Sequence, residues 1–295
     1  MARRLFCEIS PFTYYLSSQK EVLRRRLQNR RMRAVFARQK QQQKLPVCVY
    51  KHASLIRRRL GNVDMQLQEN KAVNLALAAP KVNGVLIRPG EVFSFWELVG
   101  DLTKAAGYRE GLVIVRGRPS KGMGGGMCQF TNLIHWMVLH TDLTITEHHH
   151  HDGVDLFPDY GRVIPFGTGT SILYNYLDYR FRNDTPDTWQ LIACVDGEYL
   201  RGEVRCSARP ARAYHIECRN EAFVTEPDGV WRSNEIWRIT VDARTGARLS
   251  EELLRKNHAR LAYQLPETPA SPGAPIPPAP PDLSGSDVCS GPQTK

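Results

Sequence analysis

The chain is predicted to fold as an α+β protein in which a central apolar helix packs on a mostly antiparallel sheet. Residues 130–139 are apolar on nearly all sides, which is typical of a buried central helix. Segments closer to the C-terminus alternate apolar and polar residues, which is the pattern of half-buried antiparallel strands. Turns that contain glycine or proline separate these segments. We expect a basic N-terminal helix before this domain and a small β extension after it.

Length and composition fit an ordinary soluble protein. The 295 residues are 42% hydrophobic and 24% charged. No run approaches the roughly 18 apolar residues of a membrane span, and the N-terminus, interrupted by Pro11, makes a poor secretory signal. We therefore expect a cytoplasmic protein. The seven cysteines are irregularly spaced and contain no CxxC pair. We expect most of them to be reduced, and we expect no bound cofactor.

The positive charge is concentrated at the start of the chain. Residues 1–60 carry 16 of the 40 Lys and Arg residues but only 2 of the 30 acidic ones. Residues 20–44 contain neither Gly nor Pro and are predicted to form an arginine-rich helix with an imperfect apolar stripe. Such a helix either packs on the domain or adheres to an anionic surface, either the inner membrane leaflet or nucleic acid. The remainder shows no basic patch interleaved with aromatic residues, so nucleic-acid binding is not expected.

Four segments are expected along the chain, and the bounds of the second rest on a family resemblance given below. These are a basic helical segment (1–48), an α+β domain (49–206), a β-rich extension (207–265) and a disordered Pro-rich tail (266–295).

Within the α+β domain, a helix is predicted over residues 64–79. Asp64 is placed to cap it, and Pro80 is expected to end it. Period-two patterning and turn residues predict strands over 82–87, 92–95, 112–116, 144–147, 171–183, 189–195 and 199–206.

The glycine-rich segment GMGGGMCQ is the strongest candidate for a functional site. Gly124, Gly125 and Gly126 precede Cys128, which opens the predicted central helix. Glycines allow close approach of backbone or ligand, and a helix N-terminus has unpaired N–H groups and a partial positive charge. A thiol at this position is biased toward thiolate, and the backbone N–H groups of Gly126, Met127 and Gln129 can stabilise an oxyanion.

A histidine cluster, EHHHHD, follows about twenty residues later. In an extended strand alternate side chains share a face. Glu147, His149 and His151 are therefore expected on one face, with His148 and His150 on the other.

These motifs resemble those of the VanW family, named after an accessory protein of bacterial vancomycin-resistance clusters. The matching pieces are QENKAVNLALAA, GVLIRPGEVFSFWELVG, GMGGGMCQ, EHHHHD and LDYRFRNDT, which span roughly residues 49–206. The family's histidine motif resembles E-R-H-x-H, onto which Glu147, His149 and His151 fall, whereas His148 replaces the usual arginine. The resemblance implies a bacterial context, the cell envelope, glycopeptide resistance and peptidoglycan precursors.

One interpretation of the site is a cysteine-dependent hydrolase or acyltransferase. Cys128 would be the nucleophile, His149 or His151 the base, and Asp178 the acid that orients it. This arrangement is similar to that of transglutaminase-like enzymes, and the substrate would be a peptidoglycan precursor or a related amide.

Other interpretations need no catalysis. An accessory module would bind an anionic precursor at the glycine-rich turn. Its expected ligand-binding residues are Gly124, Gly125, Gly126, Gln129, Glu147 and Arg162. A zinc site would use His149 and His151 with Cys128 or Glu147. In a purely structural role the glycines would permit tight packing and Cys128 would be buried.

Overall fold

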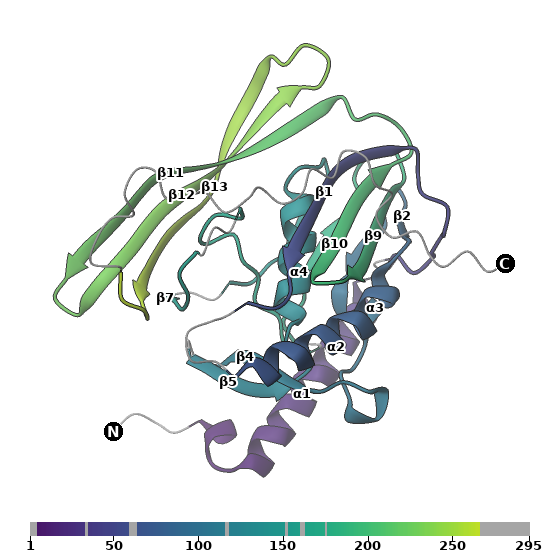
Figure 1. Cartoon of the computed structure of the whole chain (residues 1–295). Coiled ribbons are helices and arrows are strands. Elements are labelled where there is room, and N and C mark those ends of the chain that lie inside the picture. Colours follow the sequence, from purple (N-terminus) through teal and green to yellow (C-terminus); the bar gives the residue numbers. More distant parts are fainter. Residues whose placement is uncertain are drawn as a thin grey trace.

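A computed structural model describes residues 5–32, 35–58, 64–115, 118–150, 153–159, 163–174 and 176–265 (Figure 1). It confirms the α+β class with a central helix, α4 (Met127–Val138). The largest sheet of the domain is antiparallel, with the strand order β1-β10-β9-β2. Its strands are β1 (Val47–Leu55), β10 (Tyr199–Cys206), β9 (Trp189–Asp196) and β2 (Val85–Ile87).

Helix α4 lies directly on this sheet. Its residues Leu133 and Met137 pack against Gly202 of β10, where an added Cβ would come within 2.7 Å of the Met137 Cε atom. Glycine at this position therefore allows the close approach of helix and strand. On another side, Phe130 contacts Phe95, with ring centroids 5.5 Å apart. Both rings are fully buried, so α4 forms the centre of the hydrophobic core.

Helix α2 (Met65–Val82) begins as the sequence predicts but ends later. The Asp64 side chain caps it by accepting a hydrogen bond from the backbone N–H of Gln66 (2.9 Å). The expected end at Pro80 is wrong, because the N–H of Asn83 still donates to the carbonyl of Ala79 (2.9 Å) and closes the last turn around the proline.

Smaller elements surround α4. A three-stranded antiparallel sheet has the order β3-β8-β6, and the β4-β5 hairpin leads into α4. The bounds are β3 (Val92–Ser94), α3 (Phe95–Val99), η2 (Lys104–Ala106), β4 (Glu110–Val115), β5 (Arg118–Met123), β6 (Thr144–Glu147) and β8 (Arg180–Arg182). Of the strand predicted over 171–183, only β8 is formed. The backbone N–H of Leu173 donates to the Leu177 carbonyl (3.0 Å), and this tight turn interrupts the extended chain before β8.

The N-terminal helix differs in extent from the predicted one. After η1 (Phe6–Glu8), helix α1 runs over Pro11–Arg31 and does not reach residue 44. The following segment is extended, since the N–H of Ala37 donates to the Val92 carbonyl (2.9 Å) and the carbonyl of Gln39 accepts from Leu86 (2.8 Å). Pairing with the edges of β3 and β2 thus overrides the helical composition of these residues.

The C-terminal extension is a long β arm that projects from the domain (Figure 1). Its three antiparallel strands are β11 (Arg212–Glu226), β12 (Gly229–Asp242) and β13 (Arg248–Leu261), and β7 (Gly153–Asp155) pairs in parallel with β13. The buried Asp155 carboxylate connects β7 to the arm. Its Oδ2 accepts hydrogen bonds from Arg232 Nη1 (3.2 Å) and from the Tyr263 hydroxyl (2.9 Å). The predicted tail, 266–295, lies outside the described residues. Within the described parts of the chain, we find no helix with the length and apolar character of a membrane span.

Candidate functional site

Cys128 is the second residue of α4, as the sequence predicts, but its thiol is not activated. The residue is half-buried and packs against the hydrophobic core. Burial raises the pKa of the thiol, and this effect exceeds the opposite one of the nearby backbone N–H groups of Ile172 and Cys128. Cys128 is therefore a neutral thiol at neutral pH.

The histidines alternate as expected, but no hydrogen bond joins them to the Cys128 thiol among the described residues. His149 lies on the side of Glu147, with 3.0 Å between His149 Nε2 and Glu147 Oε1. His148 and His150 lie together on the other side, with ring centroids 3.9 Å apart. His151 lies outside the described residues.

His148 and His150 are half-buried and belong to an aromatic cluster that extends into the core. The His148 ring is 4.1 Å from that of His135 on α4, whose Nδ1 lies 3.0 Å from the Tyr179 hydroxyl. Burial lowers the pKa of His148 to about 4 and that of His150 to about 3, so the rings are neutral. Across the described residues, no three His, Cys, Asp or Glu side chains are placed to hold a metal ion.

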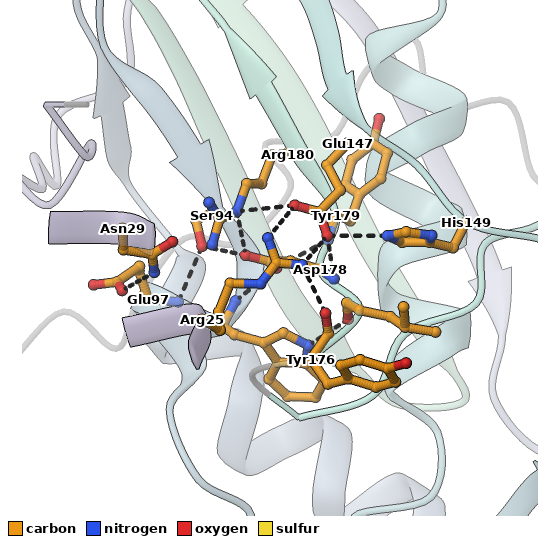
Figure 2. Close-up of polar contacts among 12 residues, drawn as sticks. Arg25, Asn29, Ser94, Glu97, Glu147, His149, Tyr176, Asp178, Tyr179 and Arg180 are labelled. Atoms are coloured by element: carbon orange, nitrogen blue, oxygen red, sulfur yellow. Dashed lines mark hydrogen bonds and ion pairs between the residues drawn. The ribbon is translucent and has the colours of Figure 1, made fainter. Parts of the chain in front are cut away.

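Glu147 is the centre of a charged network beneath α1 (Figure 2). Arg25 of α1 donates to both carboxylate oxygens (2.8 and 2.5 Å), and the N–H of Asp178 donates to one of them (2.9 Å). Burial alone would raise the pKa of Glu147, but the hydrogen bonds from Arg25, the Asp178 backbone and His149 together lower it. Glu147 is thus a structural anion already paired within the chain.

Asp178 is used to fix the start of α3 and does not orient a histidine in the described structure. Its carboxylate accepts hydrogen bonds from the Ser94 hydroxyl, the N–H of Trp96 (3.1 Å) and Arg180 Nε (2.7 Å). Arg180 is also buried and lies over the Phe36 ring, 5.3 Å from its centroid. The matched motifs EHHHHD and LDYRFRNDT therefore meet in a buried ionic network (Figure 2).

The glycine-rich turn is closely packed against its neighbours. A Cβ on Gly125 would lie 2.4 Å from the backbone of Gly111 in β4. Gly126, the N-cap of α4, has φ +111° and contacts the side chain of Lys71, to whose Cγ an added Cβ would be only 2.5 Å. Gly124 is buried against Leu102. These glycines bring the start of α4 into contact with β4 and α2.

Lys71 is the distinctive polar residue at this contact. Only 8% of it is exposed, and its ammonium group has neither a hydrogen bond nor a carboxylate partner in the described part of the chain. Burial, followed by the positive charges of Arg58 and Arg57, lowers its pKa to about 8. Gly126 provides no side-chain cap to α4, and the helix N-terminus adds a partial positive charge to the same place.

A buried donor without a partner among the described residues lies one turn earlier on the same face of α2. Gln68 is 1% exposed, and no described group accepts a hydrogen bond from its buried Nε2. The remaining predicted residue of this region, Gln129, donates to the Ser54 hydroxyl (2.8 Å) and the Leu55 carbonyl (2.9 Å). Gln129 thus ties α4 to the end of β1. We define Gln68, Lys71 and the N-terminus of α4 as the Lys71 site.

Sequence reasoning missed Lys71 and Arg25. Lys71 stands four residues from Leu67 and from Leu75, within the apolar stripe of α2. A lysine in such a stripe is a signal that could have been read. Arg25 is one of many arginines in its segment, so only the fold distinguishes it. Predicted Arg162 lies outside the described residues.

Comparison with known proteins agrees with the motifs. Residues 70–205 match the family model described as VanW like protein. The chain is 38% identical over 205 residues to the vancomycin B-type resistance protein VanW of Enterococcus faecalis, covering 70% of this chain and 74% of that protein. It is 29% identical over 118 residues to the uncharacterized protein YoaR of Bacillus subtilis, covering 39% of this chain and 36% of that one. No solved structure matches the chain. The chain therefore belongs to the VanW family.

Proposed function

We propose that this protein acts in glycopeptide resistance by binding an anionic group of a peptidoglycan precursor at the Lys71 site, without covalent catalysis. The observation that carries the proposal is a buried lysine that has no carboxylate partner among the described residues and that contacts Gly126, the N-cap of α4. A bound phosphate or carboxylate would accept hydrogen bonds from the ammonium group of Lys71 and from the first N–H groups of α4, whose N-cap Gly126 contacts the Lys71 side chain. Peptidoglycan precursors carry both kinds of anion.

The link to resistance rests on the family relationship. The Enterococcus faecalis relative is named a vancomycin B-type resistance protein. We extend this role to the present chain as part of the proposal, together with a cytoplasmic location in which soluble precursors are accessible.

The catalytic alternative has less support. A nucleophilic cysteine needs a nearby base or a lowered pKa, whereas burial raises the pKa of Cys128 and the base candidate His149 is engaged with Glu147. Cysteine-dependent hydrolase or transferase activity accordingly remains a prediction. In it, His151, which lies outside the described residues, would act as the base.

Calorimetric titration tests the binding proposal. Inorganic pyrophosphate and a uridine-diphosphate-linked muramyl peptide are titrated into the full-length protein, into Lys71→Met and into the matched control Lys104→Met, which changes an exposed lysine. Loss of a charged hydrogen-bond partner is expected to weaken binding by about tenfold or more in Lys71→Met, and the control should bind like the wild type. Equal affinities for wild type and Lys71→Met would refute the proposal.

A further inference from the structure

Helix α1 has an unusual orientation on the domain. Its inward side carries polar residues, since Arg25 donates to Glu147 and to the Tyr176 carbonyl (2.6 Å), and buried Asn29 donates to Glu97 (2.9 Å) (Figure 2). A surface helix of a globular protein normally turns its apolar side inward. Here the polar contacts with the domain determine which side of the helix remains outside.

The outer side of α1 is an apolar stripe. Phe12, Leu16, Leu23 and Leu27 are 68%, 42%, 58% and 44% exposed. Their spacing places all four on one helical face. A contiguous exposed apolar surface of this kind indicates an interaction site. We call this surface the outer face of α1.

Basic residues flank the apolar stripe. The exposed cations of the helix are Lys20, Arg24, Arg26, Arg30 and Arg31. The one acidic residue of α1 is Glu21, whose Oε2 lies 3.6 Å from Arg24 Nη1. Lys20, Leu23, Arg24, Leu27, Gln28 and Arg31 together line a shallow open depression on the outer face. Cationic groups beside an apolar stripe complement an interface of anionic headgroups over acyl chains.

We propose that the outer face of α1 is a surface by which the protein lies on an anionic phospholipid membrane. The apolar stripe enters the interface while the flanking Lys and Arg side chains reach the lipid phosphates. The contacts of Arg25 and Asn29 hold the domain on the other side of the helix, so docking requires no change in the fold. The proposal is independent of ligand binding at the Lys71 site.

Vesicle sedimentation tests this inference. The full-length protein is mixed with phosphatidylcholine vesicles that contain phosphatidylglycerol, and with pure phosphatidylcholine vesicles as the uncharged reference. Binding is expected to need the anionic lipid and to weaken as salt is raised.

Two paired variants separate the contributions of charge and apolar surface. Arg30→Gln with Arg31→Gln should weaken partitioning about 30-fold, at about fivefold for each charge. The control Arg209→Gln with Arg244→Gln removes the same charge from exposed positions elsewhere and should change binding far less. Leu23→Gln with Leu27→Gln keeps the charge and should weaken binding at least about tenfold. Its control is Val224→Gln with Leu249→Gln, which changes exposed residues of the β arm.

Equal binding to anionic and uncharged vesicles would overturn the proposal. So would α1 variants that bind anionic vesicles as strongly as their control variants. The other occupant to consider is a second copy of the chain, which light scattering detects. A dimer that Leu23→Gln with Leu27→Gln converts to monomer, together with no sedimentation on anionic vesicles, would also overturn it. Circular dichroism establishes that the variants are folded, and the charge variants remain informative if the leucine variants are not.

Discussion

Replacing Lys71 by methionine is expected to stabilise the protein in the absence of ligand. The lysine is 8% exposed, and its ammonium group has no hydrogen-bond or ionic partner among the described residues. Folding therefore takes most of the lysine side chain out of water, and no described group offsets the lost hydration of its charge. Methionine keeps most of the apolar volume of the side chain against Gly126 while it removes the charge.

The pKa gives the magnitude and the pH dependence of this effect. A folded-state pKa of about 8, against the ordinary 10.5, corresponds to at most about 3 kcal/mol at 1.36 kcal/mol per unit. Below pH 8 both folded and unfolded states carry the proton, and the full penalty applies. Between pH 8 and 10.5 the unfolded state binds more protons, so the stability of the wild type rises with pH. The difference between wild type and Lys71→Met should shrink over this range.

Urea unfolding of wild type, Lys71→Met and Lys104→Met at pH 7 and pH 10 checks the reasoning. We expect Lys71→Met to be about 1–3 kcal/mol more stable at pH 7, with an unchanged m-value and a smaller gain at pH 10. The control should stay within about 0.5 kcal/mol of the wild type at both pH values. A Lys71→Met protein less stable than the wild type at pH 7 would show that the ammonium group is satisfied in the folded state and would refute the reasoning.

Two further outcomes follow from the buried titratable groups. Lowering the pH from 7 to 5 should destabilise the fold by about 1–2 kcal/mol for each of the neutral imidazoles His148 and His150, because their folded-state pKa values of about 4 and 3 lie below the ordinary 6.5 and the unfolded chain takes up protons first. Chemical unfolding of His150→Gln should show a weaker pH dependence, and a pH dependence identical to that of the exposed-site control His215→Gln would contradict this account. Thiol labelling followed by mass spectrometry should modify exposed Cys48 and Cys218 in native protein at neutral pH well before Cys128. Rapid labelling of Cys128 would instead favour the enzyme interpretation.

The regular elements of the domain could be predicted from local pattern, while several of their ends could not. The apolar run that became α4 and the strands β9 and β10 agree with expectation. The predicted helix over 20–44 fails because the backbone groups of Ala37 and Gln39 pair with β3 and β2. Contacts between segments distant in sequence decide such boundaries, and local propensity does not record them.

The candidate site shows the same division. Alternation along an extended segment correctly separates Glu147 and His149 from His148 and His150. The predicted pairing of Cys128 with a histidine depends on the packing of α4, which places His135 against the ring of His148, and it stays a prediction. The glycines before Cys128 are explained by close backbone contacts, and these bring Lys71 to the helix N-terminus. Such proximity cannot be derived from residue spacing along one chain.

Titration of the Lys71 side chain by NMR shows whether this group is the anion-binding lysine. NMR of protein labelled with ¹³C at lysine Cε, assigned by comparison with Lys71→Met, reports the pKa of this one group with and without inorganic pyrophosphate or the muramyl peptide. The account predicts a pKa of about 8 in the free protein and a clear rise when the anion binds, since a nearby negative charge favours the ammonium form. A pKa near 10.5 in the free protein, or one that the anions leave unchanged, would contradict it.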